Sequence, residues 1–134
     1  MSKLTIVDFL MGRDKASPIT PEMKADAEDL LEKVNLLLLD FYRIFPDAPV
    51  RVITSGYRPA AINAATAGAA KKSKHMICQA VDLSDSDKLL AKYLTLFPEK
   101  LIEFDLYIED PAYTKNWTHL QLCPPKSKKR KFIP

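Results

Sequence analysis

A single long amphipathic stretch between Thr20 and Pro46 most restricts how this chain can fold. Thr20 is a good helix N-cap, and Pro21 suits the first helical position, where a missing N–H costs nothing. Apolar residues then recur every three or four positions: Met23, Ala27, Leu30, Leu31, Val34, Leu37, Leu38 and Phe41. This spacing predicts one helix that begins at Pro21 and ends before Pro46. Its broad apolar face requires a second layer of structure to cover it.

The remaining segments predict that second layer. β-Branched residues dominate 50–54, and apolar runs at 80–83, 104–108 and 117–122 also indicate strands. Two further helices are expected, an alanine-rich one at 62–70 and one at 89–97, which Asp85 or Asp87 can cap and Pro98 ends. Residues 5–11 fit a short strand or an amphipathic turn. This order predicts an α+β fold with a small, mostly antiparallel sheet flanked by helices.

The length of 134 residues is usual for one domain, so we expect a single domain over 1–134 with a basic C-terminal segment at 126–134. Five positive charges fall within 126–131, and removing them from the formal net charge of +3 leaves −2. The segment is expected to be a solvated tail. Attraction to polyanions, either nucleic acid or the anionic polymers of a bacterial wall, stays open.

The start of the chain does not have the pattern of a secretory signal peptide, because Asp8 interrupts its apolar residues and charge follows them. No apolar stretch approaches the roughly 20 residues that span a bilayer. We therefore expect synthesis in the cytoplasm and no membrane span. Cys78 and Cys123 are too few for a disulfide framework and are expected to be free thiols.

Two histidines, His75 and His119, are the chain's whole complement of imidazoles, and Asp82 lies seven positions after the first. Two imidazole nitrogens and one carboxylate oxygen leave a fourth tetrahedral position on Zn²⁺ for water, the layout of a hydrolytic zinc site. The strand period places Trp117, His119 and Gln121 on one face of 117–122, opposite the leucines. By spacing alone, two unrelated histidines and a solvated aspartate would be the better interpretation.

Four short motifs reverse that interpretation. They are Ser55-Gly56-Tyr57-Arg58, Ser73-x-His75, Gln79-Ala80-Val81-Asp82 and Trp117-x-His119. In order and spacing they resemble the M15 family of zinc D-Ala-D-Ala carboxypeptidases and endolysins, above all its small phage and prophage members. The similarity is expected to extend to the flanks, at 12–14 and 123–134. It implies a hedgehog/DD-peptidase fold and Zn²⁺ held by His75, Asp82 and His119.

The resemblance also implies roles for residues around the metal. Arg58 matches the family's anion clamp, which would hold the substrate and the oxyanion, and the planar fork of a guanidinium suits both. The alternative for Arg58 is an ordinary salt bridge at a strand end. Ser73 would bind substrate or orient a metal ligand, or else be an ordinary loop serine. Trp117 is expected to serve packing.

Two positions depart from the family pattern. Cys78 stands where glycine is usual and is expected to be a small buried residue. Asn116 stands where the carboxypeptidases carry the acid that accepts the proton of the attacking water, and a carboxamide cannot act as a general base. Glu109, at the end of the preceding strand, is the candidate replacement, with Asp110 behind it. The alternative is that both residues only begin a polar turn before Pro111.

The sequence therefore predicts a zinc-dependent peptidase that hydrolyses peptidoglycan stem peptides, as a D-Ala-D-Ala carboxypeptidase or an endolysin. The alternative is a non-catalytic zinc-binding protein of the same fold that binds the cell wall or forms part of a phage particle. A nucleic-acid role for the basic run ranks third, because no aromatic interleaving accompanies it. The protein would reach the wall or periplasm by another export route, or be carried in a virion.

Overall fold

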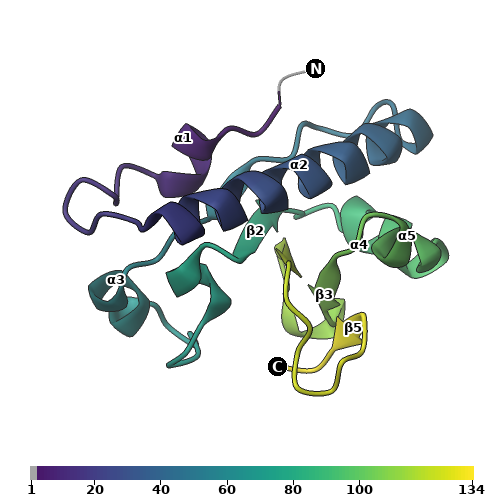
Figure 1. Ribbon diagram of the computed structural model, residues 1–134. Coiled ribbons are helices and arrows are strands. Elements are labelled where there is room, and N and C mark those ends of the chain that lie inside the picture. Colours follow the sequence, from purple (N-terminus) through teal and green to yellow (C-terminus); the bar gives the residue numbers. More distant parts are fainter. Residues whose placement is uncertain (1–2) are drawn as a thin grey trace.

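The computed structural model describes residues 3–134, in which a long helix lies along one face of a five-stranded sheet (Figure 1). The helices are α1 (Ile6–Leu10), α2 (Pro21–Ile44), α3 (Ala60–Ala65), α4 (Leu89–Leu96) and α5 (Glu99–Glu103). There are also two short 3-10 helices, η1 (Lys74–Ile77) and η2 (Pro111–Tyr113). The strands are β1 (Ile53–Ser55), β2 (Ala80–Ser84), β3 (Tyr107–Glu109), β4 (Trp117–Gln121) and β5 (Lys131–Phe132). The predicted α+β fold with a small sheet is confirmed.

Helix α2 forms where its caps and its apolar period predict it. The Thr20 side chain accepts a hydrogen bond from the backbone N–H of Met23 at 3.1 Å, and Pro21 occupies the first turn. The helix ends at Ile44, two residues before Pro46. The predicted stripe is buried at Ala27, Leu30, Leu31, Val34, Leu37, Leu38 and Phe41, while Met23 is only partly buried. Tyr42, which was not predicted, is buried with them. Burial of this stripe against the sheet forms most of the core.

The sheet has the order β1-β2-β4-β3-β5, and every pairing is antiparallel except β3 with β5. In the central pair Asp82 lies opposite His119, and the neighbouring Val81 lies opposite Leu120. Successive side chains point to opposite faces of a strand. Val81 and Leu120 therefore enter the core beneath α2, while Asp82 and His119 share the other face.

Two expected elements near the N-terminus differ from the structure. Residues 6–10 form helix α1 rather than a strand or a turn, because Thr5 and Asp8 make a capping box. Strand β1 begins at Ile53, not at residue 50, and its pairing with β2 shifts register between Ile53 and Ser55. The backbone N–H of Arg51 donates to the Tyr42 hydroxyl instead of joining a ladder.

Further along the chain, the boundaries of several elements also differ from those expected. Helix α3 occupies Ala60–Ala65 rather than 62–70, and Thr66 caps it in an extended conformation. Helix α5 was not expected, and it occupies the residues just before the strand expected at 104–108. Asp105 then takes a left-handed conformation, with φ of 53°, so that β3 starts only at Tyr107.

The basic C-terminal segment is more ordered than a solvated tail. Lys131 and Phe132 form β5, parallel to β3. Arg130 lies 4.2 Å above the ring of Tyr107 and pairs with Asp105 at 3.0 Å. These contacts fix the end of the chain against the edge of the sheet, although the other basic residues of the run are exposed.

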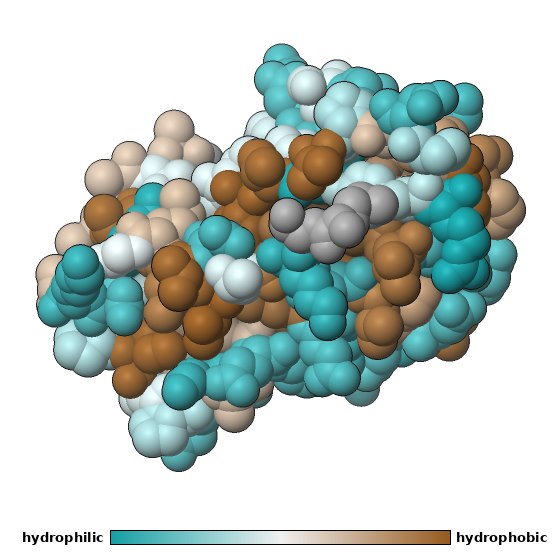
Figure 2. Space-filling view, turned by 90° about the horizontal axis from the view of Figure 1, so that it is seen from above, coloured by the Kyte–Doolittle hydropathy of each residue, from teal (hydrophilic) through white to brown (hydrophobic). Residues whose placement is uncertain are grey.

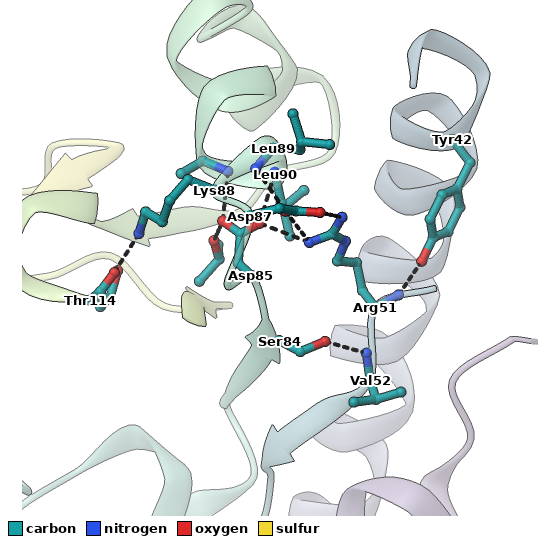
Figure 3. Close-up of polar contacts among 12 residues, drawn as sticks. Tyr42, Arg51, Val52, Ser84, Asp85, Asp87, Lys88, Leu89, Leu90 and Thr114 are labelled. Atoms are coloured by element: carbon teal, nitrogen blue, oxygen red, sulfur yellow. Dashed lines mark hydrogen bonds and ion pairs between the residues drawn. The ribbon is translucent and has the colours of Figure 1, made fainter. Parts of the chain in front are cut away.

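A buried ion network joins β2, α4 and the start of β1 (Figure 3). Arg51 is 3% exposed. Its guanidinium donates one hydrogen bond of 3.0 Å to Asp85 and two of 2.7 Å to Asp87. Asp85 also accepts the N–H groups of Leu90 and Ala91, and Asp87 accepts that of Leu89. Lys88 occupies the N-cap position of α4, and the two aspartates, which the sequence offered as alternative caps, together accept the N–H groups of its first turn. The network fixes the end of β2, two residues after Asp82.

None of the helices formed by residues 3–134 combines the length and apolarity needed to cross a membrane.

Candidate metal centre

Three side chains that can bind a metal meet on the face of the sheet that points away from α2. They are His75 from η1, Asp82 from β2 and His119 from β4. One ligand-capable atom of each lies within 4.8 Å of the others, and the two imidazole ring centres are 5.2 Å apart. His75 is 1% exposed, and the side chains of His119 and Asp82 are partly buried, at 12% and 14% exposed. The structure therefore brings together the three ligands that the sequence predicts.

His75 is held by the backbone around it. The Ser73 hydroxyl accepts the His75 N–H at 3.2 Å, which begins η1. Nδ1 of His75 lies 2.8 Å from the carbonyl oxygen of Gly56, which can only accept, so Nδ1 carries a proton. Nε2 then faces Oδ1 of Asp82 at 3.3 Å and has no hydrogen-bond partner among residues 3–134. A buried nitrogen lone pair that faces a carboxylate is suited to a cation between them.

Gly56 must be a glycine for this arrangement to form. A Cβ at this position would lie 2.1 Å from the carbonyl oxygen of Phe9, a distance that no side chain tolerates. The same oxygen accepts the Tyr57 N–H at 2.9 Å, which ties α1 to the end of β1. The glycine of the first motif therefore brings its own carbonyl within reach of His75.

The ring of His119 is oriented by Gln121, to which the sequence assigned no role. Nε2 of Gln121 donates to the carbonyl oxygen of Cys123 at 2.8 Å, so Oε1 points the other way, to Nε2 of His119 at 2.8 Å. An amide oxygen only accepts, and Nε2 of His119 is therefore protonated. Nδ1 remains for Asp82, whose Oδ1 lies 2.9 Å away. The sequence carried a signal for this contact, because Gln121 lies two residues after His119 and therefore on the same face of the strand.

The electrostatics of the cluster fit a divalent cation. Burial alone would raise the pKa of Asp82, but its contacts with His119 and His75 outweigh burial and hold that pKa well below its usual range. Burial lowers the pKa of His75, so this ring stays neutral at neutral pH. Each imidazole turns one nitrogen inward and donates its other N–H to a fixed acceptor, as metal-binding histidines do. The residues present therefore fit Zn²⁺, which favours two imidazoles and a carboxylate.

Arg58 lies beside this cluster as a buried guanidinium with no carboxylate within 4.0 Å in the described part of the chain. Its backbone N–H donates to the His75 carbonyl at 3.1 Å, and Nη2 donates to the Ser73 hydroxyl at 3.4 Å. Its Nε has no partner among residues 3–134. Burial lowers the pKa of Arg58, while Asp82 raises it and Arg13 lowers it further. The ordinary salt bridge considered as its alternative is thus not found, and an anion would complete its surroundings.

Glu109 and Asn116 lie in different surroundings. The β3–β4 register pairs Ile108 with Leu120, and its continuation places Glu109 beside His119 on the same face. Burial raises the pKa of the Glu109 carboxyl, His119 lowers it and Asp82 raises it.

Asn116 is exposed, and its backbone carbonyl accepts the N–H of Asp85. Asp110 caps η2 through the Ala112 N–H at 3.0 Å.

Two further residues shape the site. Cys78 is fully buried and adopts a left-handed conformation, with φ of 62°, at the end of η1. Glycine takes this conformation most easily, which explains why a glycine is usual at this position.

Phe132 of β5 lies with its ring centre 6.1 Å from that of His119, edge to face. The sequence did not predict this wall of the site. Trp117 is half-buried at the start of β4, opposite Ser84.

Comparison with known proteins returned one family. A search of curated proteins and a search of solved structures gave no match. The family model for peptidase M15 matches residues 14–121, which include all three candidate ligands, Arg58 and Glu109. The match runs from Asp14 to Gln121, so the similarity expected at residues 12–13 and 123–134 lies outside it. Because the match covers most of the chain, this protein belongs to the peptidase M15 family.

Proposed function

We propose that this protein is a zinc-dependent peptidase that hydrolyses peptidoglycan stem peptides, as a D-Ala-D-Ala carboxypeptidase or an endolysin. One observation carries the proposal: His75, Asp82 and His119 converge with both outer ring nitrogens already bonded, next to a buried guanidinium that lacks a carboxylate. Membership of the peptidase M15 family supports the same reaction class.

The metal would be held by Nε2 of His75, a carboxylate oxygen of Asp82 and Nδ1 of His119, the atoms that face one another. When bound, Zn²⁺ would supply a Lewis acid that polarises a peptide carbonyl and makes water a better nucleophile at neutral pH. Gly56 and Gln121 hold the two rings in the tautomers that this binding requires.

Glu109 is the group we propose to carry the proton from the attacking water to the departing amine. Its place beside His119 in the β3–β4 ladder supports this role. Its half-buried position raises its pKa above the usual value, which brings a carboxyl closer to the range where it can both accept and donate a proton.

Arg58 is the proposed anion clamp, with Ser73 as its support. The guanidinium is fixed by the Ser73 hydroxyl and has an unused N–H in a buried place. A substrate carboxylate, or the oxyanion that forms when the peptide carbonyl is attacked, would satisfy it with charge-assisted hydrogen bonds. Lysine would be a poor substitute because it offers no planar fork.

The second candidate is a non-catalytic zinc-binding protein of the same fold that binds the cell wall or forms part of a phage particle. Asn116 favours it, because a carboxamide stands where an acid is expected. The two candidates differ in whether Glu109 acts as a base. For either one we propose action at the cell wall or periplasm, or transport in a virion.

Zymography against purified cell wall tests the proposal. We expect a cleared band from the wild-type protein, its loss with a chelator and its return with added zinc. His119→Ala should lose both zinc and clearing, because two ligands rarely hold zinc. Glu22→Gln, on the exposed first turn of α2, is the matched control and should clear normally. Binding to sedimented wall without clearing at any pH would reject the peptidase and favour the second candidate.

A further inference from the structure

The outer side of α2 carries a stripe of four exposed residues that the core does not use. Glu32, Leu36, Leu39 and Arg43 follow one another at intervals of four, three and four, so they lie in one line along the helix. Leu36 is 50% exposed, Leu39 55%, and the Arg43 side chain 73%. Two adjacent leucines left in water along one helix are the kind of surface that a partner covers.

The leucines line a groove of about 580 Å³ between α2 and the N-terminal segment. The Asn35 side chain forms one wall by holding the backbone of Leu4 on both sides, accepting its N–H at 2.9 Å and donating to its carbonyl at 3.0 Å. Figure 2 views this side of the molecule and shows hydrophobic groups set among hydrophilic ones. The groove is mostly apolar, with Glu28 and Glu32 among its charged lining residues.

The order of residues in the stripe is self-complementary. When two copies of α2 cross in antiparallel directions about the midpoint between Leu36 and Leu39, each Leu36 meets Leu39 of the other copy. The same symmetry places Glu32 opposite Arg43 of the other copy, and this pair occurs twice. Arg43 can reach it, because its contact with Asp40 on its own helix is long, at 3.8 Å, and leaves most of the side chain exposed.

We propose that this stripe, defined by Glu32, Leu36, Leu39 and Arg43, is the interface through which the protein forms a two-fold symmetric dimer. An isologous interface needs one patch that is complementary to itself, and the acid–leucine–leucine–base order provides it. A different partner would need no such symmetry in the stripe. The interface lies across the core from His75, Asp82 and His119, so it leaves the metal centre accessible and does not depend on the proposed reaction.

Sedimentation equilibrium of the full chain across a range of concentrations tests the dimer. We expect a monomer–dimer equilibrium for the wild type and, for Leu36→Lys with Leu39→Lys, a dissociation constant at least about tenfold higher. Both leucines are exposed, so the variant should keep its circular dichroism and melting temperature. Val7→Lys, which changes a hydrophobic residue exposed at 76% outside the stripe, is the matched control and should dimerise normally.

Charge reversal tests the antiparallel geometry separately. Glu32→Arg and Arg43→Glu should each weaken self-association by about three- to tenfold, because each variant brings like charges together at both pairs. A mixture of the two variants should associate more tightly than either alone, since every pair is then Arg with Glu. A monomer at all concentrations, a dimer that the leucine changes leave intact, or a mixture no tighter than its components would each overturn the proposal.

Discussion

Oε1 of Gln121 lies 2.8 Å from Nε2 of His119, and the other end of the same amide donates to the Cys123 carbonyl. This contact fixes which nitrogen of His119 faces Asp82. The orientation of His119, the second histidine of the candidate metal centre, thus depends on a neutral side chain two residues away on the same strand.

Replacing Gln121 should weaken metal binding while the three ligands stay in place. Gln121→Met removes the acceptor, and we expect the zinc dissociation constant to rise by about 10- to 100-fold, whereas Gln121→Glu keeps an acceptor oxygen and should stay within a few-fold of the wild type. Competition with a chromophoric chelator measures the affinities, and nitrogen NMR of the metal-free protein reports the His119 tautomer. Equal affinities for all three proteins would show that Gln121 has no orienting role.

Glu109→Gln should separate proton transfer from metal and substrate binding. We expect kcat to fall by about 10²- to 10⁴-fold, with KM and zinc content unchanged, because the amide occupies the same space but cannot accept a proton. Asp110→Asn is the neighbouring control: Asp110 caps η2, and its replacement should change kcat little. If both variants keep wild-type kcat, the base is another group.

The Arg51–Asp87 pair should make stability depend on acid pH. Hydrogen bonds from Arg51 lower the pKa of Asp87 from 3.8 to about 2, so the folded state holds the ionised form more strongly than the unfolded state does. The stabilisation is complete above pH 3.8 and is lost as the pH falls through about 2. The difference in free energy of unfolding between wild type and Asp87→Asn should shrink over that interval in urea titrations. A difference that does not vary with pH would contradict this.

Because the backbone of Cys78 is left-handed, we expect glycine to be tolerated at this position at least as well as alanine. In the middle of a helix or strand, glycine is less stable than alanine by roughly 0.5–1 kcal/mol. At φ of 62° the steric cost falls on alanine instead, so Cys78→Gly should be at least as stable as Cys78→Ala. Denaturant unfolding of the two variants decides the matter, and the ordinary preference for alanine would show that this conformation carries no cost.

The parts of the fold that sequence alone predicts are those with strong local signals. Helix α2 has an N-cap, a proline at its start and an apolar stripe along most of its length, so both its ends are predicted closely. The capping box of Thr5 and Asp8 was an equally local signal for α1. However, a helix of five residues is too short for a repeating apolar pattern to be recognised in it. Strand β5 has two residues in a basic run and exists only through its pairing with β3, which no local pattern reveals.

The candidate site divides in the same way. His75, Asp82 and His119 were expected together because of the motifs, since their spacing alone does not distinguish a metal site from chance. The role of Gln121 depends on which way an amide faces, and the wall formed by Phe132 depends on a parallel pairing, so both needed the structure. For Arg58, the sequence offered an anion clamp or an ordinary salt bridge. The structure rules against the salt bridge, because the buried guanidinium has no carboxylate within 4.0 Å among residues 3–134.

Zinc titration of the chelator-treated protein, with release of amine from a synthetic stem peptide as the signal, tests the central claim most directly. The account predicts no release without zinc and a rise that saturates at one zinc per chain, with no rise at all for His119→Ala. Zinc that binds to the wild-type protein at one per chain without any hydrolysis of stem peptide would contradict it.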